Sequence, residues 1–513
     1  MVVAPRAAKL ATKGLLGAGL GVVAKKRKRR ARKPEPKLKM ADEANHIHII
    51  TTACLPWLTG TAVNPLLRAA YLSRLSRKVT LVVPWLAQED QRNVFPGAKS
   101  FASPEDQADF VKGWVENRVG FPADFNIKFY PGRYAYDKGS ILGVGDITKY
   151  IPDSEAHIAV LEEPEHLNWY HHGTQWTRKF KHVVGICHTN YLDYAKREEG
   201  IGPFKQQMLK RLNQVVTRAH CHQVIKLSDA VQWMPRQDTC FVHGVSPTFL
   251  NVGVRKRELA AGTQRFQKGV YFIGKAIWGK GYTEVVQLLK EHQRRNGREC
   301  HVDLYGSGQD LTEIQNVAQH HGLDVSFFPG RDHVDPDMHE YKVFINPSRS
   351  DVVATTTAEA LAMGKFVIVE DLPCNRFFST FTNCLVYRTS EEFSQCLARA
   401  MASEPAPLDE VDRQRLSWEA ATERFLHVAE PNGKSDSLKE KVLGGLSYRT
   451  HNFLAGLEPV RCMLGAGKGT RENPANVTDV RPTNAGDSGW IDTNRYHNQL
   501  SRPSSAADLP TKA

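Results

Sequence analysis

The chain has 513 residues, which exceeds the size of one ordinary hydrophobic core and predicts two or more domains. Its composition is typical of a globular protein, and no run of 18 apolar residues could span a membrane. Nine scattered cysteines without a CxxC pair favour reduced thiols over a disulfide framework or a zinc site.

The net charge of +13 is concentrated at the N-terminus. Residues 1–40 contain 13 of the 68 Lys and Arg residues and a single acid, Glu35, so the rest of the chain carries a net charge of only +1. A nearly neutral body does not indicate nucleic-acid binding, and no nucleic-acid partner is expected.

The basic tract follows a mildly apolar stretch at residues 14–24, which is too short for a transmembrane helix. We interpret residues 1–44 as a targeting or membrane-anchoring segment, because each Lys or Arg near an anionic lipid surface contributes about 1 kcal/mol. Deleting residues 1–40 is then expected to release the protein from its membrane without unfolding it. A solvated basic tail and a nuclear localisation signal are the alternatives.

The folded body is predicted to begin with strands at residues 46–50 and 78–84 and a helix at 66–75 between them. A strand, loop, helix and strand form the unit of a parallel sheet. Pro56, Gly60 and Pro65 are expected to interrupt the chain before that helix. The backbone at Gly60, in a TGT loop, could approach a phosphate, although a single glycine also fits an ordinary turn.

Two further strands of the first half end in polar residues. A strand at 157–161 runs into Glu162 and Glu163, and a strand at 183–187 runs into His188. Open α/β sheets bind ligands beyond the carboxyl ends of their strands, so these residues are candidates for a site. For His188 a purely structural hydrogen bond is the alternative.

Residues 204–219 have the spacing of an amphipathic helix. Such helices usually pack on a sheet, and the more specific alternative is a face that contacts a membrane. Strands at 222–227 and 239–243 are expected to close the first domain. The polar, mixed-charge residues 250–267 are interpreted as an interdomain linker.

A second series of strands is predicted at residues 270–273, 301–305, 325–328, 343–345 and 366–369, with helices between them. Four loops should therefore meet at one edge of a parallel sheet, at residues 274–281, 306–308, 330–333 and 346–359.

These loops carry the residues that a nucleotide sugar requires. Lys275 and Lys280 could neutralise a diphosphate, while the glycines let the backbone approach it. Surface lysines in a turn would be the alternative for either lysine alone. Glu359, expected at the start of a helix over 358–363, could accept hydrogen bonds from ribose hydroxyls, and Asp351 from a second sugar. The pattern favours a nucleotide-sugar site.

These residues, together with several longer segments, resemble a known family. Lys275 and Lys280 stand where the retaining family 4 glycosyltransferases of the GT-B fold have an Arg and a Lys five apart, and Asp351-x7-Glu359 replaces their usual Glu-x7-Glu element. Four longer segments resemble the plant and algal digalactosyldiacylglycerol synthases: LPWLTGTAVNPLLRAAYL, VLEEPEHLNWYHHG, FIGKAIWGKGY and DVVATTTAEALAMGK. The resemblance covers roughly residues 45–428.

The resemblance implies an α/β, GT-B architecture of two Rossmann-like, doubly wound domains facing across a cleft. Residues 45–255 would form the lipid-acceptor domain and 268–410 the UDP-sugar domain. Residues 411–430 would form a helix packing back towards the first domain. The resemblance does not cover residues 431–513, whose Gly, Ser, Asn, Pro and Thr content predicts a mostly disordered tail with a helix around residues 437–456.

The implied reaction is the retaining transfer of galactose from UDP-galactose to monogalactosyldiacylglycerol, without a metal or other cofactor. The implied location is the cytosolic face of the chloroplast outer envelope, with the basic tract on anionic lipids. The main alternative is another family 4 UDP-sugar transferase with a different lipid or a soluble acceptor, and a membrane-surface scaffold or a nuclear protein is a distant one.

Residue roles follow from the same resemblance. Lys275 and Lys280 would bind the leaving diphosphate, Glu359 the ribose, Asp351 the galactose hydroxyls, and His188 the donor sugar near its 6-hydroxyl; these five are the candidate catalytic residues. Further donor contacts would come from Gly60, Gly274, Gly306, Arg331 and Thr355, and Glu162 or Glu163 would orient the acceptor.

Overall fold

The computed structural model describes residues 38–40, 42–136, 139–169, 173–192, 202–260, 263–297, 300–457 and 459. Residues 1–37 of the anchor predicted at 1–44 lie outside this part of the chain, as do residues 458 and 460–513 of the predicted tail. Within the described part, no helix combines the length and the apolar character needed to cross a membrane. The cysteines that the structure describes are free thiols.

The first domain is built on a sheet whose strand order is β4-β3-β2-β1-β5-β6-β7-β8, parallel except for the β3–β4 pair. Its strands are β1 (His46–Ile50), β2 (Lys78–Trp85), β3 (Asn126–Ala135), β4 (Ser140–Gly143), β5 (Ile158–Glu162), β6 (His182–Cys187), β7 (Gln223–Lys226) and β8 (Gln237–Thr239). Strands β1 and β5 are neighbours although they are far apart in sequence, so the strand order reverses between them.

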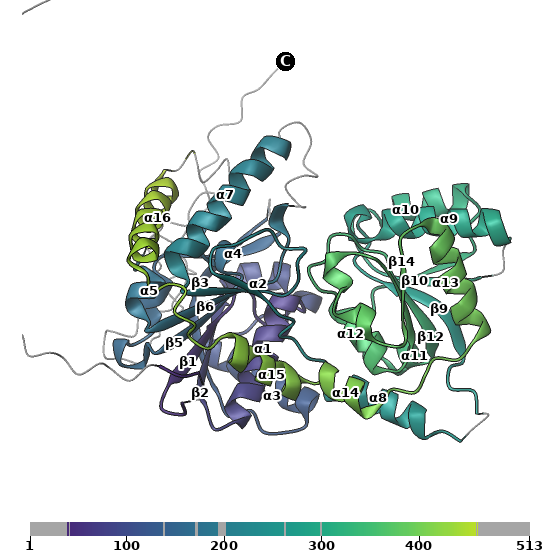
Figure 1. Cartoon of the computed structure of the whole chain (residues 1–513), viewed down its shortest axis with the longest axis horizontal. Coiled ribbons are helices and arrows are strands. Elements are labelled where there is room, and N and C mark those ends of the chain that lie inside the picture. Colours follow the sequence, from purple (N-terminus) through teal and green to yellow (C-terminus); the bar gives the residue numbers. More distant parts are fainter. Residues whose placement is uncertain are drawn as a thin grey trace, which may run out of the picture. The chain divides into compact units, whose positions relative to one another are not determined.

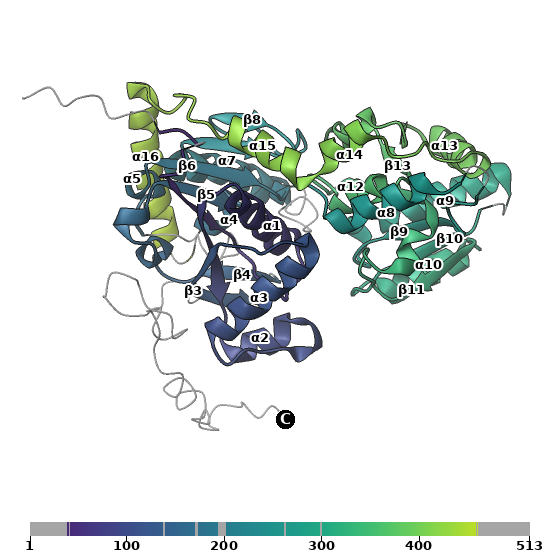
Figure 2. The same ribbon diagram turned by 90° about the horizontal axis from the view of Figure 1, so that it is seen from below.

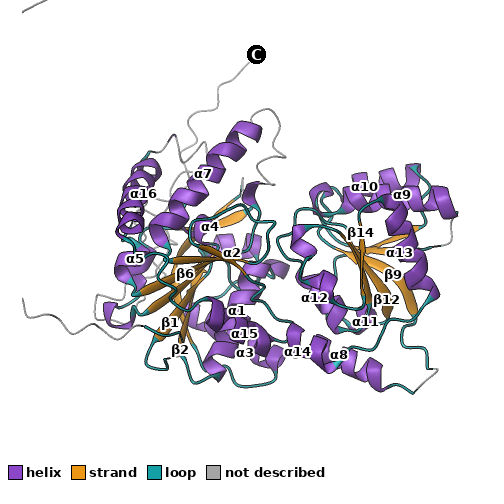
Figure 3. Cartoon of the chain, viewed as in Figure 1, coloured by secondary structure: helices purple, strands orange, loops and turns teal. Residues whose placement is uncertain are grey.

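Helices cover both faces of this sheet (Figure 3). They are α1 (Gly60–Arg74), α2 (Gln88–Val94), α3 (Pro104–Val119), α4 (Pro164–Asn168), α5 (Trp176–Lys179) and α7 (Gly202–His220). Helix α1 contacts α3, whereas α4 and α5 contact α7. Helix α7 thus packs within the domain, as the more common interpretation of its amphipathic pattern predicted.

Helix α1 begins earlier than predicted, because Pro65 does not interrupt it. A proline inside a helix removes the N–H that would bond to the carbonyl four residues before it. Here that carbonyl belongs to Thr61, and it accepts a hydrogen bond from the Thr51 hydroxyl instead. The carbonyl of Thr61 is therefore satisfied, and the helix begins at Gly60 rather than at residue 66.

The second domain has a parallel sheet in the order β11-β10-β9-β12-β13-β14, which is the 3-2-1-4-5-6 order of a Rossmann fold. Its strands are β9 (Lys268–Ile273), β10 (Val302–Tyr305), β11 (Val325–Phe328), β12 (Tyr341–Asn346), β13 (Phe366–Glu370) and β14 (Cys384–Tyr387). The predicted doubly wound α/β class, with two Rossmann-like sheets, is confirmed.

Alternate residues of these strands enter two different cores. Phe366 and Ile368 pack with the core on one face, whereas Val367 and Val369 pack with the core on the other. Because both faces of the sheet are covered, the sequences of its strands are continuous apolar runs. Figure 1 shows the covering helices on both sides of the sheet: α9 (Tyr282–Asn296), α10 (Leu311–His320), α11 (Pro336–His339), α12 (Thr355–Ala362) and α13 (Ser390–Ala402).

The segment interpreted as a linker begins as a helix. Helix α8 (Pro247–Glu258) packs against α12, and its Phe249, Leu250 and Val252 are buried in the core of the second domain. The closeness of the contact requires glycine at 253, because a Cβ there would lie 2.1 Å from the carbonyl oxygen of Ala362. The polar residues around this buried stripe concealed it in the sequence.

Beyond the second sheet, α14 (Glu410–Leu416) leads into α15 (Trp418–Val428), which packs on α1 and contributes Trp418 and Phe425 to the first domain's core. Helix α16 (Leu438–Gly456) follows and packs along α7. The helix expected around residues 437–456 of the tail is therefore confirmed, although its packing along α7 was not predicted. The predicted start of the body is also late, since Met40 is 1% exposed within the first core.

Candidate functional site

The reversal of strand order in each sheet marks where a site is expected. In the second sheet it lies between β9 and β12, and in the first between β1 and β5. The loops that leave the carboxyl ends of these strands separate there and open a crevice in doubly wound folds. The loops predicted from sequence at residues 274–281 and 346–359 follow β9 and β12 directly.

Glycines allow the loops after β9 and β10 to lie against each other. The Gly274 N–H donates to the Tyr305 carbonyl at 3.0 Å, and the Ala276 N–H donates to the Ser307 carbonyl at 3.1 Å. A Cβ at Gly306 would lie only 2.2 Å from the Gly274 carbonyl oxygen. Gly306 is therefore required for the position of the loop that carries both lysines, whether or not it touches a ligand.

Lys275 and Lys280 extend from that loop. Burial lowers the pKa of the Lys275 ammonium, and the nearby charge of Lys280 lowers it further. The Lys275 side chain is exposed, so repulsion from Lys280 contributes more to this lowering than burial does. Lys280 Nζ lies 3.7 Å from Asp351 Oδ1, which joins the loop after β9 to the loop after β12.

Helix N-termini add positive potential at the same edge. Gly281, with φ of 100°, precedes α9, and a Cβ there would lie 3.4 Å from the Ser348 backbone. Ala354 precedes α12, so neither helix has a side-chain cap on its first N–H groups. Uncapped N–H groups attract anions and hydroxyls. Thr355 is the first residue of α12 and lies at this end.

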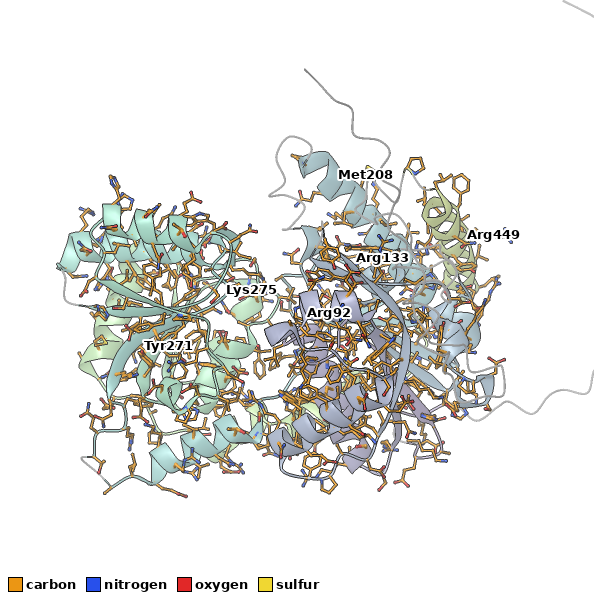
Figure 4. All side chains as sticks on the ribbon, turned by 180° about the vertical axis from the view of Figure 1, so that it is seen from behind. Arg92, Arg133, Met208, Tyr271, Lys275 and Arg449 are labelled. Carbon is orange, nitrogen blue, oxygen red and sulfur yellow. The ribbon has the colours of Figure 1, made fainter. Side chains whose placement is uncertain are left out.

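Glu359 lies in the second turn of α12 rather than at the helix start that the sequence suggested. Its Oε2 is 2.8 Å from His333 Nδ1, and His333 Nε2 is 2.6 Å from the Tyr271 hydroxyl. Burial and Glu359 raise the pKa of Tyr271, so its O–H donates to His333, which in turn donates to Glu359. Figure 4 shows Tyr271 within the sheet and Lys275 at its loop end.

Sequence reasoning missed His333 and Tyr271. Tyr271 lies in the middle of β9 and looks like an ordinary core aromatic, and His333 is the last residue of the loop predicted at 330–333 but was given no role. The one available signal was the position of His333 just beyond β11, at the same edge of the sheet as Glu359.

Arg331 forms ion pairs with residues that are not among the predicted donor contacts. Its Nη1 is 2.7 Å from Asp337 Oδ2, and its Nε is 3.7 Å from Asp335 Oδ2. It follows β11, the edge strand two positions from the strand-order reversal. Its role at a donor site remains a prediction.

At the reversal in the first sheet, Gly60 is the first residue of α1, and Thr59 before it provides no side-chain cap. An uncapped helix N-terminus beside a glycine matches the predicted approach to a phosphate.

Glu162 connects α1 to the residues beyond β6. Its Oε1 accepts a hydrogen bond from Arg68 Nε at 2.8 Å, and its Oε2 accepts one from His188 Nε2. Burial raises the pKa of Glu162, but the charges of Arg68 and His188 outweigh it and hold the pKa below its ordinary value. The carboxylate therefore fixes the imidazole of His188, whose ring centroid lies 4.9 Å from that of His243.

Glu163 adopts a left-handed backbone conformation, with φ of 60°. Its carboxylate accepts hydrogen bonds from the hydroxyls of Thr52, at 3.0 Å, and Thr189. Burial raises the pKa of Glu163, but the hydrogen bond and charge of His166, with contributions from His188 and Thr189, hold it at about 2. Glu163 thus combines a positive φ with a buried carboxylate. Backbone strain of this kind is found at functional sites.

Among the described residues, His46, His48 and Glu155 are close enough together to share a metal ion. They lie at the opposite, amino-terminal end of β1, and Lys128 Nζ is 3.1 Å from Glu155 Oε2. That cation already neutralises the carboxylate, so we assign no metal there.

Comparison with known proteins gives concordant results. The family model described as glycosyl transferases group 1 matches residues 267–403. Digalactosyldiacylglycerol synthase 1, chloroplastic, from Glycine max is 49% identical over 458 residues, covering 84% of this chain and 58% of that protein. Digalactosyldiacylglycerol synthase 2, chloroplastic, from Lotus japonicus is 51% identical over 437 residues, covering 82% of this chain and 94% of that protein.

The chain thus spans little more than half of the Glycine max relative. Among solved structures, a sucrose-phosphate synthase from Thermosynechococcus elongatus is 12% identical and aligns with a TM-score of 0.46, covering 75% of this chain and 98% of that one.

Proposed function

The chain belongs to the digalactosyldiacylglycerol synthase family, and on that premise we propose that it is a galactosyltransferase which converts monogalactosyldiacylglycerol to digalactosyldiacylglycerol. The donor is UDP-galactose, and the configuration at the anomeric carbon is retained. The observation that carries the proposal is the edge of the second sheet, where two lysines and two uncapped helix N-termini adjoin Asp351 and Glu359.

The second domain binds the donor. Lys275 and Lys280 neutralise the diphosphate, and Gly274 and Gly281 allow the backbone to approach it. Glu359, oriented by His333, accepts hydrogen bonds from the ribose hydroxyls. Asp351 accepts them from galactose, and Thr355 adds a contact at the start of α12.

In the reaction the bond between the galactose anomeric carbon and the phosphate oxygen breaks, and a bond to the acceptor hydroxyl oxygen forms on the same face. The proton of the acceptor hydroxyl passes to the leaving phosphate oxygen. Lys275 and Lys280 stabilise the charge that develops on the diphosphate, which is the kind of electrostatic contribution that lowers such barriers most. This neutralisation by protein cations makes a metal ion unnecessary.

The first domain binds the lipid acceptor and completes the donor site. His188 contacts the transferred sugar near its 6-hydroxyl, and Gly60 lets the start of α1 approach the phosphates. Glu162 and Glu163 already have protein partners at their carboxylate oxygens. We therefore assign them a positioning role, Glu162 through His188 and Glu163 through Thr189, in place of direct contact with the acceptor.

We place the protein at the cytosolic face of the chloroplast outer envelope, bound at its surface. The relatives are named chloroplastic, which supports the organelle. The basic tract of residues 1–37 supports contact with anionic lipids.

Expression in bacteria supplied with monogalactosyldiacylglycerol tests the function. We expect thin-layer analysis of their lipids to show a digalactolipid that depends on Glu359. A glycosylated product on a different lipid, or on a soluble acceptor alone, would instead identify another transferase of the same fold.

A further inference from the structure

Helix α16 has an apolar face that the first domain does not cover. Its large apolar residues on that face are 80%, 61%, 59% and 66% exposed: Leu438, Val442, Leu446 and Phe453. At 100° per residue these positions fall within about 80° of arc, so they form one stripe along the helix.

The opposite face of α16 is bound firmly to the domain. Gly444, His451 and Ala455 are buried against α7, beside which α16 lies in both Figure 1 and Figure 2. The Tyr448 hydroxyl donates to the Gly173 carbonyl at 2.9 Å, and Arg218 Nη1 lies 3.4 Å from Glu440 Oε1. The exposed stripe therefore belongs to a fixed helix.

Two exposed lysines, Lys439 and Lys441, lie on either side of the stripe. Arg449 is also exposed and falls within the stripe, and Figure 4 shows it on the outer side of α16. The helix contains a single acid, Glu440, and it faces α7. Exposed Leu, Val and Phe on one helix face, with lysines beside them and an arginine among them, favour contact with a lipid interface that carries negative charge.

We infer that the outer face of α16 docks on a membrane surface that contains anionic lipids. Self-association through this face is disfavoured, because it would bring the cations of two copies together. The inference rests on the proposed function, because a lipid acceptor gives the protein a reason to dock on a membrane. Helix α7, which carries α16, also packs on α4, and α4 begins directly after Glu163. Docking through α16 would thus bring the acceptor domain to its substrate.

The test uses the purified full chain and its sedimentation with phosphatidylcholine vesicles, with and without phosphatidylglycerol. Two double variants probe the face: Leu446→Ser with Phe453→Ser, and Lys439→Gln with Lys441→Gln. All four side chains are exposed, so the fold should persist. Matched controls are Val411→Ser, at a valine that is 67% exposed in α14, and Lys290→Gln, at an exposed lysine in α9.

We expect the apolar variant to bind both kinds of vesicle about tenfold more weakly. The cation variant should lose about fivefold per lysine, on phosphatidylglycerol vesicles only. Residues 1–37 contribute alike in every protein and cancel in the ratio. Wild-type binding by both double variants, or a dimer in light scattering that the apolar variant abolishes, would overturn the proposal.

Activity measured in detergent micelles separates this proposal from the proposed function. The α16 variants should transfer galactose to micellar lipid at the wild-type rate, because none of the four substituted residues is assigned to the proposed donor or acceptor site. If the wild-type protein makes no digalactolipid in micelles, the proposed function fails, while the vesicle measurements still decide the role of α16.

Discussion

Lys280 and Asp351 meet across the strand-order reversal of the second sheet, with Nζ 3.7 Å from Oδ1. One residue follows β9 and the other follows β12, so seventy residues of sequence separate them. In the proposed function the lysine binds phosphate and the carboxylate binds sugar. Their contact marks the point where the bond between sugar and phosphate would lie.

Removing either the phosphate-binding lysine or the ribose-binding glutamate should abolish most turnover. Lys280→Ala and Glu359→Ala are each expected to lower kcat with UDP-galactose roughly 10²-fold or more, the scale of losing one transition-state stabiliser. Lys290→Ala, at an exposed lysine of α9, is the control and should keep wild-type activity. Near-normal digalactolipid formation by both folded variants would refute the donor-site assignment.

The aspartate at 351 can be tested by charge and by length. Asp351→Asn removes the charge that faces Lys280 and should lower kcat strongly, whereas Asp351→Glu retains it and should cost less. Steady-state kinetics with UDP-galactose give both values. Equal losses in the two variants would mean that the charge at this position is not what matters.

The proximity of Lys275 and Lys280 predicts a dependence on pH. Repulsion and burial lower the pKa of Lys275, so its ammonium is lost as the pH rises through that lowered value, and donor binding should weaken there. Lys275→Arg should move this alkaline limb to higher pH, because a guanidinium stays charged. Titration of UDP-galactose by calorimetry across pH tests this, and an unchanged limb would show that another group titrates.

Arg68 should be essential to the stability of the first domain. Its guanidinium is fully buried, pairs with Glu162, and lies 4.8 Å from the Phe425 ring of α15. Arg68→Met leaves the buried Glu162 carboxylate with His188 as its remaining ionisable partner and should cost about 3 kcal/mol in unfolding free energy.

The matched control is Arg74→Met. Arg74 pairs with Glu419 at the surface, where both side chains are more than half exposed, and should cost less than about 1 kcal/mol. Denaturant unfolding measures both variants. Equal, small effects would mean that Glu162 finds water or another partner when Arg68 is removed.

Glu165 predicts how stability changes with pH. Burial, with a contribution from Glu163, raises its pKa to about 8 from an ordinary value near 4.5. The folded state then binds a proton that the unfolded state has released, so stability falls as pH rises between about 4.5 and 8. Glu165→Gln should flatten this slope. A slope unchanged in the variant would show that Glu165 is ionised in the fold.

The sequence predicted the strand-end loops well because strands and glycines mark them locally. The strand at 325–328 and the loop containing Lys275 and Lys280 were placed correctly by apolar runs ending at Gly274 and Gly330. Fixed spacing along the chain also related Asp351 to Glu359.

Relationships between distant segments could not be predicted in the same way. His333 and Tyr271 support Glu359 because the fold brings the loop after β11 and the middle of β9 next to α12. Arg68 resembled an ordinary helical cation until Glu162 was found opposite it. A helix around residues 437–456 was expected, but its packing on α7, more than two hundred residues earlier, was not.

The most direct measurement is transfer by the purified full-length chain in detergent micelles containing monogalactosyldiacylglycerol. With UDP-galactose, the account predicts digalactosyldiacylglycerol whose new linkage has the donor's α configuration by NMR, and roughly 10²-fold less product from Glu359→Ala. No digalactolipid from the folded wild-type protein, or a β linkage in the product, would contradict it.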